Sequence, residues 1–418
     1  MLEYIRKLWK IEDLRKKILY TFGMLILFRL VGCIPAPGID TAAVGLGGNN
    51  LPLLDVMNMM TGGMMSQMTI MAMGISPYIN SSIIMQLLCI ALPVLERMQQ
   101  EEGGREKINR ISRYVTIALA VIQAIGLSNG LGYAKDGLWN NILIGVSMAG
   151  GTALAMWIGE RITDKGIGNG ISLLIFAGIV SNLFNGIVAG FRNAGTVTAF
   201  LGAFAILAVL VILTFVVTFI DLGERRIPLQ IAKQVKGRRV YGGQNTHMTL
   251  KVISVGVMPL IFAYSFLSFP GTIGQLVAPN SGFTAWCNAN LVNGAWVHLI
   301  LSALLIFAFT FFYSSISFDA KKQAEQLQQQ GATIPGRRGK DIAAYLLRTT
   351  NRLNLFAALF LSVLAAIPTL MLSGLSLQVP FAASSMLIAV SVSLETMRTI
   401  KGEMAIRGIQ SDKDNGFM

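Results

Sequence analysis

Long apolar segments alternate with shorter polar segments along nearly the whole chain. Ten of the apolar segments approach the roughly 17–25 residues that a helix needs to cross the hydrocarbon core of a bilayer. They cover residues 18–34, 71–92, 114–131, 142–158, 171–189, 197–220, 252–276, 296–318, 353–372 and 381–394. Because backbone polar groups cannot stay unpaired in lipid, these segments predict an all-α polytopic membrane protein with ten transmembrane helices.

The basic residues fall on one side of this predicted bundle. Of the 34 Lys and Arg residues, 31 precede the first segment, occupy every second loop or follow the last segment. Only Lys135 and Arg192 lie in the other loops, and Arg29 lies inside the first segment. Cytoplasmic loops carry the excess of Lys and Arg, so we expect both termini in the cytoplasm. Topology and attraction to anionic lipids therefore account for the net charge of +13 without a nucleic-acid target.

The number of segments also predicts how the two halves of the chain are related. If the chain consists of two similar halves of five helices each, the odd number forces the second half to be inverted relative to the first. We divide the chain into a cytoplasmic amphipathic segment (1–17), an N-terminal half (18–192), a C-terminal half (193–398) with cytoplasmic loops 221–251 and 319–352, and a cytoplasmic tail (399–418).

Acidic and histidine side chains are absent from the middle of the predicted helices. Those nearest to the helices, at their ends, are Glu160, Asp221, His298, Asp319 and Glu395. Ion-coupled transporters usually need such groups near the membrane midplane, and an intramembrane enzyme needs a nucleophile with its base, paired acids or a metal-ligand cluster. We therefore expect no catalytic residue, no cofactor and no metal site.

Arg29 is the one cation well inside a predicted helix, and it lies toward the outer end, where a long side chain can extend to the interface. We interpret it as an interface anchor or a helix-packing contact, although a functional role stays open. The three cysteines, Cys33, Cys89 and Cys287, show neither paired spacing nor a metal-binding motif. They are interpreted as core or loop residues.

A methionine-rich segment, residues 51–68, precedes the second predicted helix on the outer side. It reads LPLLDVMNMMTGGMMSQM and is too short to cross the membrane before that helix begins. We expect it to fold back into the protein as a re-entrant or half-inserted helix, broken at Gly62 and Gly63. Flexible methionines fill irregular space, which suits a removable stopper. An outer lid that never moves is the alternative.

Five motifs, in order and between the expected helices, resemble the SecY family of protein-conducting channel subunits. They are IPAPGID at 34–40, GISPYINSSIIMQLL at 74–88, GERITDKGIGNGISLLIFAGIV at 159–180, GRRVYGGQNTHMTLKV at 237–252 and GATIPGRRG at 331–339. The resemblance runs from about residue 14 to the tenth segment. It implies an hourglass of two inverted five-helix halves that opens sideways to lipid between the second, third, seventh and eighth helices.

The resemblance also implies a constriction lined by aliphatic side chains. The matching residues are Ile79, Ile83, Ile175, Ile179, Ile261 and Ile388. A narrow aliphatic collar dewets and blocks hydrated ions, yet it offers no hydrogen bond that could hold a passing peptide. Such a ring suits the passage of an unfolded chain.

By the same resemblance, a plug over residues 53–68 closes the outer funnel. Its predicted residues are Val56, Asn58, Met59, Met60, Thr61, Gly62, Gly63, Met64, Met65 and Ser66. The predicted lateral gate comprises Asn80, Ser82, Gln86, Tyr264 and Ser265. The polar groups of the second helix either bond across this gate or bond only within the bundle.

The two long basic loops match positions where the family engages ribosomal RNA or the motor ATPase SecA. The residues concerned are Lys236, Arg238, Arg239 and Arg338. Arginine suits both partners because it pairs with phosphate or carboxylate in a bidentate manner. A role in setting topology is the alternative for these cations. The chain has no GxxxxGK[ST] motif, so a partner must supply the energy of transport.

Together with these features, the resemblance implies a bacterial inner-membrane channel for unfolded secretory polypeptides that releases apolar segments laterally into lipid. The partners implied are the membrane subunits SecE and SecG, SecA, the ribosome, precursor polypeptides and anionic lipids. An inverted-repeat secondary solute transporter is the alternative function. A passive membrane scaffold would leave the plug-like segment and the aliphatic ring unexplained.

Overall fold

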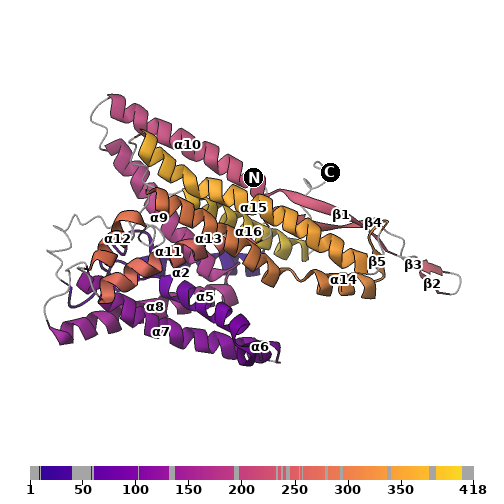
Figure 1. Cartoon of the computed structure of the whole chain (residues 1–418), viewed down its shortest axis with the longest axis horizontal. Coiled ribbons are helices and arrows are strands. Elements are labelled where there is room, and N and C mark those ends of the chain that lie inside the picture. The colour runs from indigo at the N-terminus through magenta and orange to yellow at the C-terminus, as the bar shows by residue number, and fades with distance from the viewer. Residues whose placement is uncertain are drawn as a thin grey trace.

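The structure is a computed structural model of the full chain, and a few segments fall outside its description. The described residues are 9, 11–39, 58, 61–101, 103–130, 137–192, 197–231, 234–236, 239–241, 245–253, 255–256, 258–277, 281–291, 295–336, 340–375 and 383–406. Helices make up most of them (Figure 1).

Each of the ten expected apolar segments overlaps one helix. These helices are α2 (Glu12–Val31), α5 (Ser76–Ala91), α7 (Gly104–Gly130), α8 (Leu138–Lys165), α9 (Gly170–Arg192), α10 (Val197–Asp221), α11 (Met258–Val277), α13 (Trp296–Ser317), α15 (Lys340–Leu375) and α16 (Ala383–Ile406). A short helix that the hydropathy pattern did not predict, α12 (Gly282–Asn290), precedes α13. The helix expected from residue 71 begins only at Ser76, because residues 71–75 form turns.

Four helical stretches among the described residues are long and apolar enough to cross a membrane. They are Glu106–Ser128, Trp139–Lys165, Trp296–Gln329 and Asp341–Ala366. A fifth candidate is the bent pair α5 and α6 (Pro93–Gln100). Shorter apolar helical stretches cover Gly170–Asn185, Leu207–Asp221 and Met258–Leu267. The structure is therefore that of a multi-pass helical protein, while membrane crossing by each of the ten helices stays a prediction.

The bend between α5 and α6 has a local cause. The helix direction bends by 105° at Leu92, which adopts an extended conformation just before Pro93. Proline disfavours helical geometry in the residue before it, and its fixed φ suits the first turn of the next helix. The chain therefore leaves the direction of α5 abruptly at this point.

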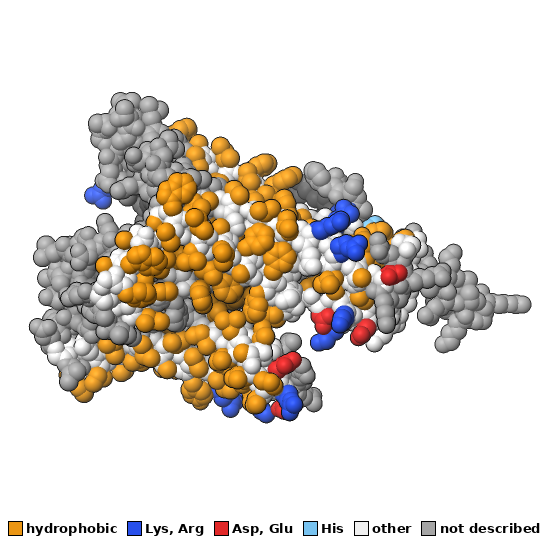
Figure 2. Space-filling model, viewed as in Figure 1, with side chains coloured by type: hydrophobic (Ala, Val, Ile, Leu, Met, Phe, Trp, Pro, Cys, Tyr) orange, Lys and Arg blue, Asp and Glu red, His pale blue; other side chains and the backbone are white. Residues whose placement is uncertain are grey.

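Large apolar side chains cover the outside of the bundle. Figure 2 shows that hydrophobic side chains dominate the middle of the visible face, while most of the visible charged side chains gather toward one end. Phe215 and Phe219 on α10 are both 72% exposed. So much exposed apolar surface is unusual for a water-soluble monomer but is expected where helices face lipid.

The two basic loops form one small domain at the charged end of the molecule (Figure 1). A three-stranded sheet has the order β4 (Asn245–Lys251), β1 (Glu224–Ile231), β5 (Ala332–Thr333), and both strand pairs are antiparallel. The sheet packs with α14 (Ala320–Gln329) and the start of α15 around ten buried residues, among them Ile227, Leu229 and Leu346. We call this unit the basic domain.

The expectation of an entirely α-helical chain is therefore wrong for these loops. Along β1, buried Ile227 and Leu229 alternate with exposed neighbours, which is the two-residue period of a half-buried strand. The prediction was based on long apolar runs, so it did not include this short alternation of apolar and polar residues in β1. A further hairpin, β2 (Gln234–Lys236) with β3 (Arg239–Tyr241), projects at the same end (Figure 1).

Candidate functional site: an isoleucine neck

The structure brings all six predicted ring isoleucines into one buried cluster. Ile79 and Ile83 come from α5, Ile175 and Ile179 from α9, Ile261 from α11 and Ile388 from α16. Within α5 and α9, the members of each pair are four residues apart and therefore share a helix face. We call these six residues the isoleucine neck.

The side chains of the neck are buried by apolar packing. None of the six side chains is more than 8% exposed. Phe28, Met64 and Met71 belong to the same cluster, so the methionine-rich segment shares an apolar core with the neck. Aliphatic side chains offer no hydrogen bond to water or to a peptide, so a constriction of this kind excludes hydrated ions without binding a polypeptide. Whether these isoleucines line a pore stays a prediction.

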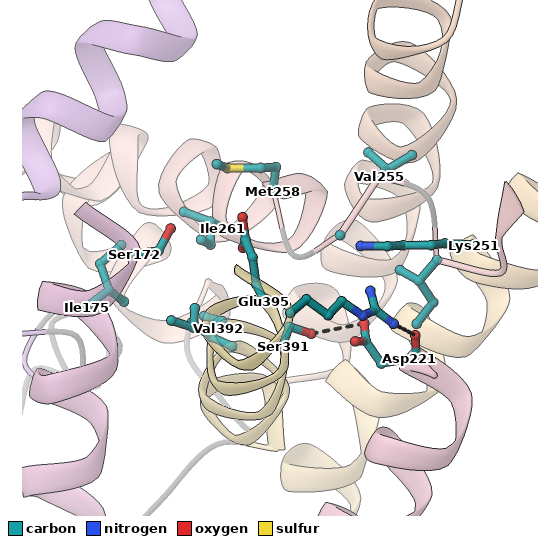
Figure 3. A pocket seen from close by; sticks show the side chains of 14 residues that line it. Ser172, Ile175, Asp221, Lys251, Val255, Met258, Ile261, Ser391, Val392 and Glu395 are labelled. Atoms are coloured by element: carbon teal, nitrogen blue, oxygen red, sulfur yellow. Dashed lines mark hydrogen bonds between the residues drawn. The ribbon is translucent and has the colours of Figure 1, made fainter. Parts of the chain in front are cut away.

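A cavity of about 260 Å³ lies against the neck. Ile175, Ile261 and Ile388 form part of its wall, while its polar lining includes Asp221, Lys251, Glu395 and Arg398 (Figure 3). The cavity therefore has an apolar wall formed by neck residues and a charged lining contributed by α10, α16 and β4.

A buried acid organises this lining. Asp221, at the end of α10, accepts a hydrogen bond from Ser391 Oγ at 3.3 Å, and its backbone oxygen accepts one from Arg398 Nη2 at 3.4 Å (Figure 3). Both donors come from α16. The sequence identified Asp221 only as an acid at a helix end. Nothing in the sequence predicted its partners Ser391 and Arg398, which are 170 and 177 residues away.

The predicted plug is only partly inside the described residues. Val56, Met59 and Met60 lie outside them. Asn58 and Thr61 are helical, and the chain turns at Gly62 and Gly63, whose φ angles are +73° and +87°. These left-handed conformations favour glycine and account for the end of the helical geometry.

After these glycines the chain forms turns rather than the expected half-inserted helix. Met64, Met65 and Met68 are buried, whereas Ser66 is exposed. Met65 and Met68 pack in a second cluster with residues of α7 and α8. The segment is thus held between the neck and this second cluster. Its role as a movable plug stays a prediction.

The predicted gate residues fall into two groups. Ser82 and Gln86 line a cavity of about 290 Å³ whose wall also includes Ser112 of α7 and Ile316 of α13. Asn80 lies on the same helix and is buried. On α11, Tyr264 stacks on His298 of α13, with ring centroids 6.1 Å apart. Helices α5 and α11 contact each other directly, as a gate between them requires.

The predicted partner-binding cations are described only in part. Lys236 and Arg239 face each other in the register of the β2–β3 hairpin, which carries them away from the bundle. Arg238 and Arg338 lie outside the described residues. The backbone at Lys236 and Arg239 thus belongs to a projecting hairpin, which is compatible with contact to a large partner.

Comparison with known proteins relates this architecture to protein translocases. The sequence model of the SecY family matches residues 69–397. A protein translocase subunit SecY from Streptomyces scabiei is 37% identical and covers 98% of this chain and 99% of its own. The corresponding protein of Escherichia coli K12 is 38% identical over 93% of this chain and 91% of its own length.

Solved structures share the fold at lower sequence identity. One protein-conducting channel superposes with a TM-score of 0.72 at 19% identity, covering 95% of both chains. Sec61 in the canine ribosome–channel complex from the endoplasmic reticulum gives a TM-score of 0.68 at 17% identity, again covering 95% of both chains. The arrangement of helices around the isoleucine neck is thus a known channel fold.

Proposed function

Because this chain belongs to the SecY family, we propose that it is the channel subunit of a bacterial protein translocase. It passes unfolded secretory polypeptides across the inner membrane and releases apolar segments laterally into lipid. The isoleucine neck is the observation that carries this proposal, since four helices from both halves of the chain supply its six buried side chains. An unfolded peptide can pass such a neck without being held, whereas hydrated ions cannot enter it.

The architecture proposed for this function has ten transmembrane helices in two inverted halves, residues 18–192 and 193–398. Segment 53–68 is the plug. The gate opens between α5 and α7 on one side and α11 and α13 on the other. Contact between α5 and α11, and the polar cavity lined by Ser82 and Gln86, support this assignment. Both termini and the basic domain face the cytoplasm, in keeping with the distribution of Lys and Arg.

The partners follow from the same proposal. SecE and SecG complete the membrane complex, and SecA or a translating ribosome delivers the precursor to the basic domain. The relatives are named as translocase subunits, and one similar chain comes from a ribosome–channel complex. Anionic lipids surround the basic side. None of these relatives is a solute transporter, so the transporter alternative has no support.

Reconstitution tests the proposal directly. The chain is purified with SecE and SecG, placed in liposomes and supplied with SecA, ATP and a secretory precursor. We expect the precursor to become protected from external protease only when both SecA and ATP are present. A complex that is correctly assembled and binds SecA but protects no precursor would contradict the proposed function.

A further inference from the structure

Arg29 connects three segments that are distant in the sequence. Its guanidinium leaves α2 and donates through Nη1 to the backbone oxygen of Gly62 at 3.3 Å and through Nη2 to that of Ala177 at 2.6 Å. Gly62 belongs to the methionine-rich segment and Ala177 to α9. The planar guanidinium presents several N–H donors in a fixed fork, so it can bond two carbonyl groups at once, whereas a lysine ammonium is a compact point charge.

A second side chain holds the same segment from α9. Asn182 Nδ2 donates to the backbone oxygen of Asn58 at 2.8 Å. That oxygen also accepts from Thr61 Oγ1 and from the backbone N–H of Gly63, and Asn58 Oδ1 accepts from the N–H of Ser66. The turn is thus closed by its own hydrogen bonds and is bound to the bundle at both Asn58 and Gly62.

Close approach at Gly62 requires glycine. A Cβ atom built there would lie 2.4 Å from both terminal nitrogens of Arg29. The neighbouring Gly63 has a similar left-handed backbone, but a Cβ atom there would meet only Asn182 Oδ1, at an ordinary 3.4 Å. A methyl group at position 62 therefore displaces the guanidinium, while one at position 63 does not.

The bound turn leads directly to the neck. Two residues after Gly62, Met64 packs in the same cluster as the six isoleucines, together with Phe28, the residue before Arg29. Position 62 is therefore fixed by polar contacts at the point where the chain enters this apolar cluster. Releasing the turn removes a restraint on Met64 and so loosens the packing of this cluster.

We propose that Arg29 and Asn182 are positioning residues that clasp the turn formed by Asn58 and residues 61–68. Their two carbonyl contacts, at Gly62 and Asn58, hold Met64 against the isoleucine neck. The consequence for ion sealing rests on the proposed channel function, but the clasp itself does not. The opposing interpretation is that Arg29 only joins α2 to α9 and that burial of Met64, Met65 and Met68 suffices to fix the segment.

Backbone hydrogen exchange separates these interpretations without relying on transport. The full chain, assembled with its membrane partners in liposomes, is compared with Arg29→Gln, Asn182→Leu and the control Arg192→Gln, which removes an exposed cation at the end of α9. A hydrogen bond to a charged group contributes enough that exchange over residues 61–68 should rise roughly tenfold or more in Arg29→Gln. Asn182→Leu should raise it several-fold, and Arg192→Gln should match the parent. Unchanged exchange in both clasp variants would overturn the proposal.

A glycine pair provides a matched second test that leaves Arg29 and Asn182 in place. Gly62→Ala and Gly63→Ala both strain a left-handed backbone, but only the first displaces the guanidinium. We expect faster exchange and a higher resting chloride leak for Gly62→Ala than for Gly63→Ala. Equal behaviour of the two variants would refute the clasp. If the parent transports no precursor, the proposed function fails, while the exchange comparison still decides the clasp.

Discussion

Gln230 and Thr333 pair in antiparallel register although 103 residues separate them in the sequence. Thr333 Oγ1 also donates to the backbone oxygen of Gln230 at 3.3 Å. This contact joins the first basic loop to the second, and both contribute side chains to one buried cluster. A partner that binds either loop therefore meets a single folded domain.

Charge reversal in the two basic loops should weaken partner engagement. A partly exposed charged hydrogen bond contributes about 1–3 kcal/mol, so Arg239→Glu or Arg338→Glu should lower SecA or ribosome affinity roughly tenfold. The measurement is precursor-stimulated ATP hydrolysis by SecA together with ribosome binding. Arg192→Glu, predicted to lie on the opposite side of the membrane, should leave both unchanged. Normal values in both basic-loop variants would contradict the assignment.

The core of the basic domain should be sensitive to truncation. Leu346 is fully buried in the domain cluster, so Leu346→Ala should destabilise it by about 2–5 kcal/mol. Its neighbour Leu347 is 53% exposed, and Leu347→Ala is the matched control. Limited proteolysis of residues 224–251 should accelerate only in the first variant. Equal protection of the two proteins would show that the cluster does not support the sheet.

Polar or shortened side chains in the neck should admit water. Combining Ile83→Asn with Ile175→Gly places an amide and a void in the cluster, so the resting ion conductance in planar bilayers should rise. Precursors with poorly apolar signals should also pass more readily, because weaker packing lowers the cost of opening. Ile300→Asn alters a side chain that is 63% exposed and should change expression rather than conductance. Ion-tight neck variants would remove the basis for the pore.

A covalent bridge across the proposed gate should stop transport. After Cys33, Cys89 and Cys287 are replaced, cysteine pairs are scanned between residues 81–86 and 264–269. A disulfide needs Cα atoms roughly 4.4–6.8 Å apart, and some pairs between the contacting helices α5 and α11 should meet this requirement. Oxidation of such a pair should block precursor transport, and reduction should restore it. Continued transport through the locked protein would exclude a gate at this position.

Labelling should establish the orientation. In the same cysteine-free background, cysteines at positions 238 and 338 should react with an impermeant thiol reagent only when the cytoplasmic side is accessible. Cysteines at positions 280 and 290 should react only from the outside. The reversed pattern would disprove the proposed topology. Replacing the native thiols matters because Cys33 is exposed, whereas Cys89 and Cys287 are buried.

Hydropathy and family resemblance together predicted the helices and the grouping of the neck. Apolar segments of membrane length are visible in the sequence, and each overlaps a helix. The convergence of Ile79, Ile175 and Ile388 could not come from periodicity, because the aliphatic residues Ile, Leu and Val recur in every apolar segment and the pattern does not say which face meets another helix. The motifs of the family supplied that information.

Contacts between polar groups that are distant in the sequence could not be predicted from the sequence alone. Arg29 stood out as a cation within an apolar segment, but nothing in the residues around it identified the carbonyl groups of Gly62 and Ala177 as its partners. Likewise, β5 is only two residues long, and its pairing with β1 depends on tertiary packing rather than local propensity.

Helix α15 gives the molecule a mechanical link between the basic domain and the bundle. Leu346 lies in the core of the basic domain, while Leu361 and Leu364, farther along the same helix, lie in the core shared with α11 and α13. No proline or glycine occurs between Lys340 and Leu364, so the usual causes of a kink are missing from this stretch. If a partner tilts the basic domain, α15 therefore transmits that movement to α11 and α13, the helices of the proposed gate that it packs against.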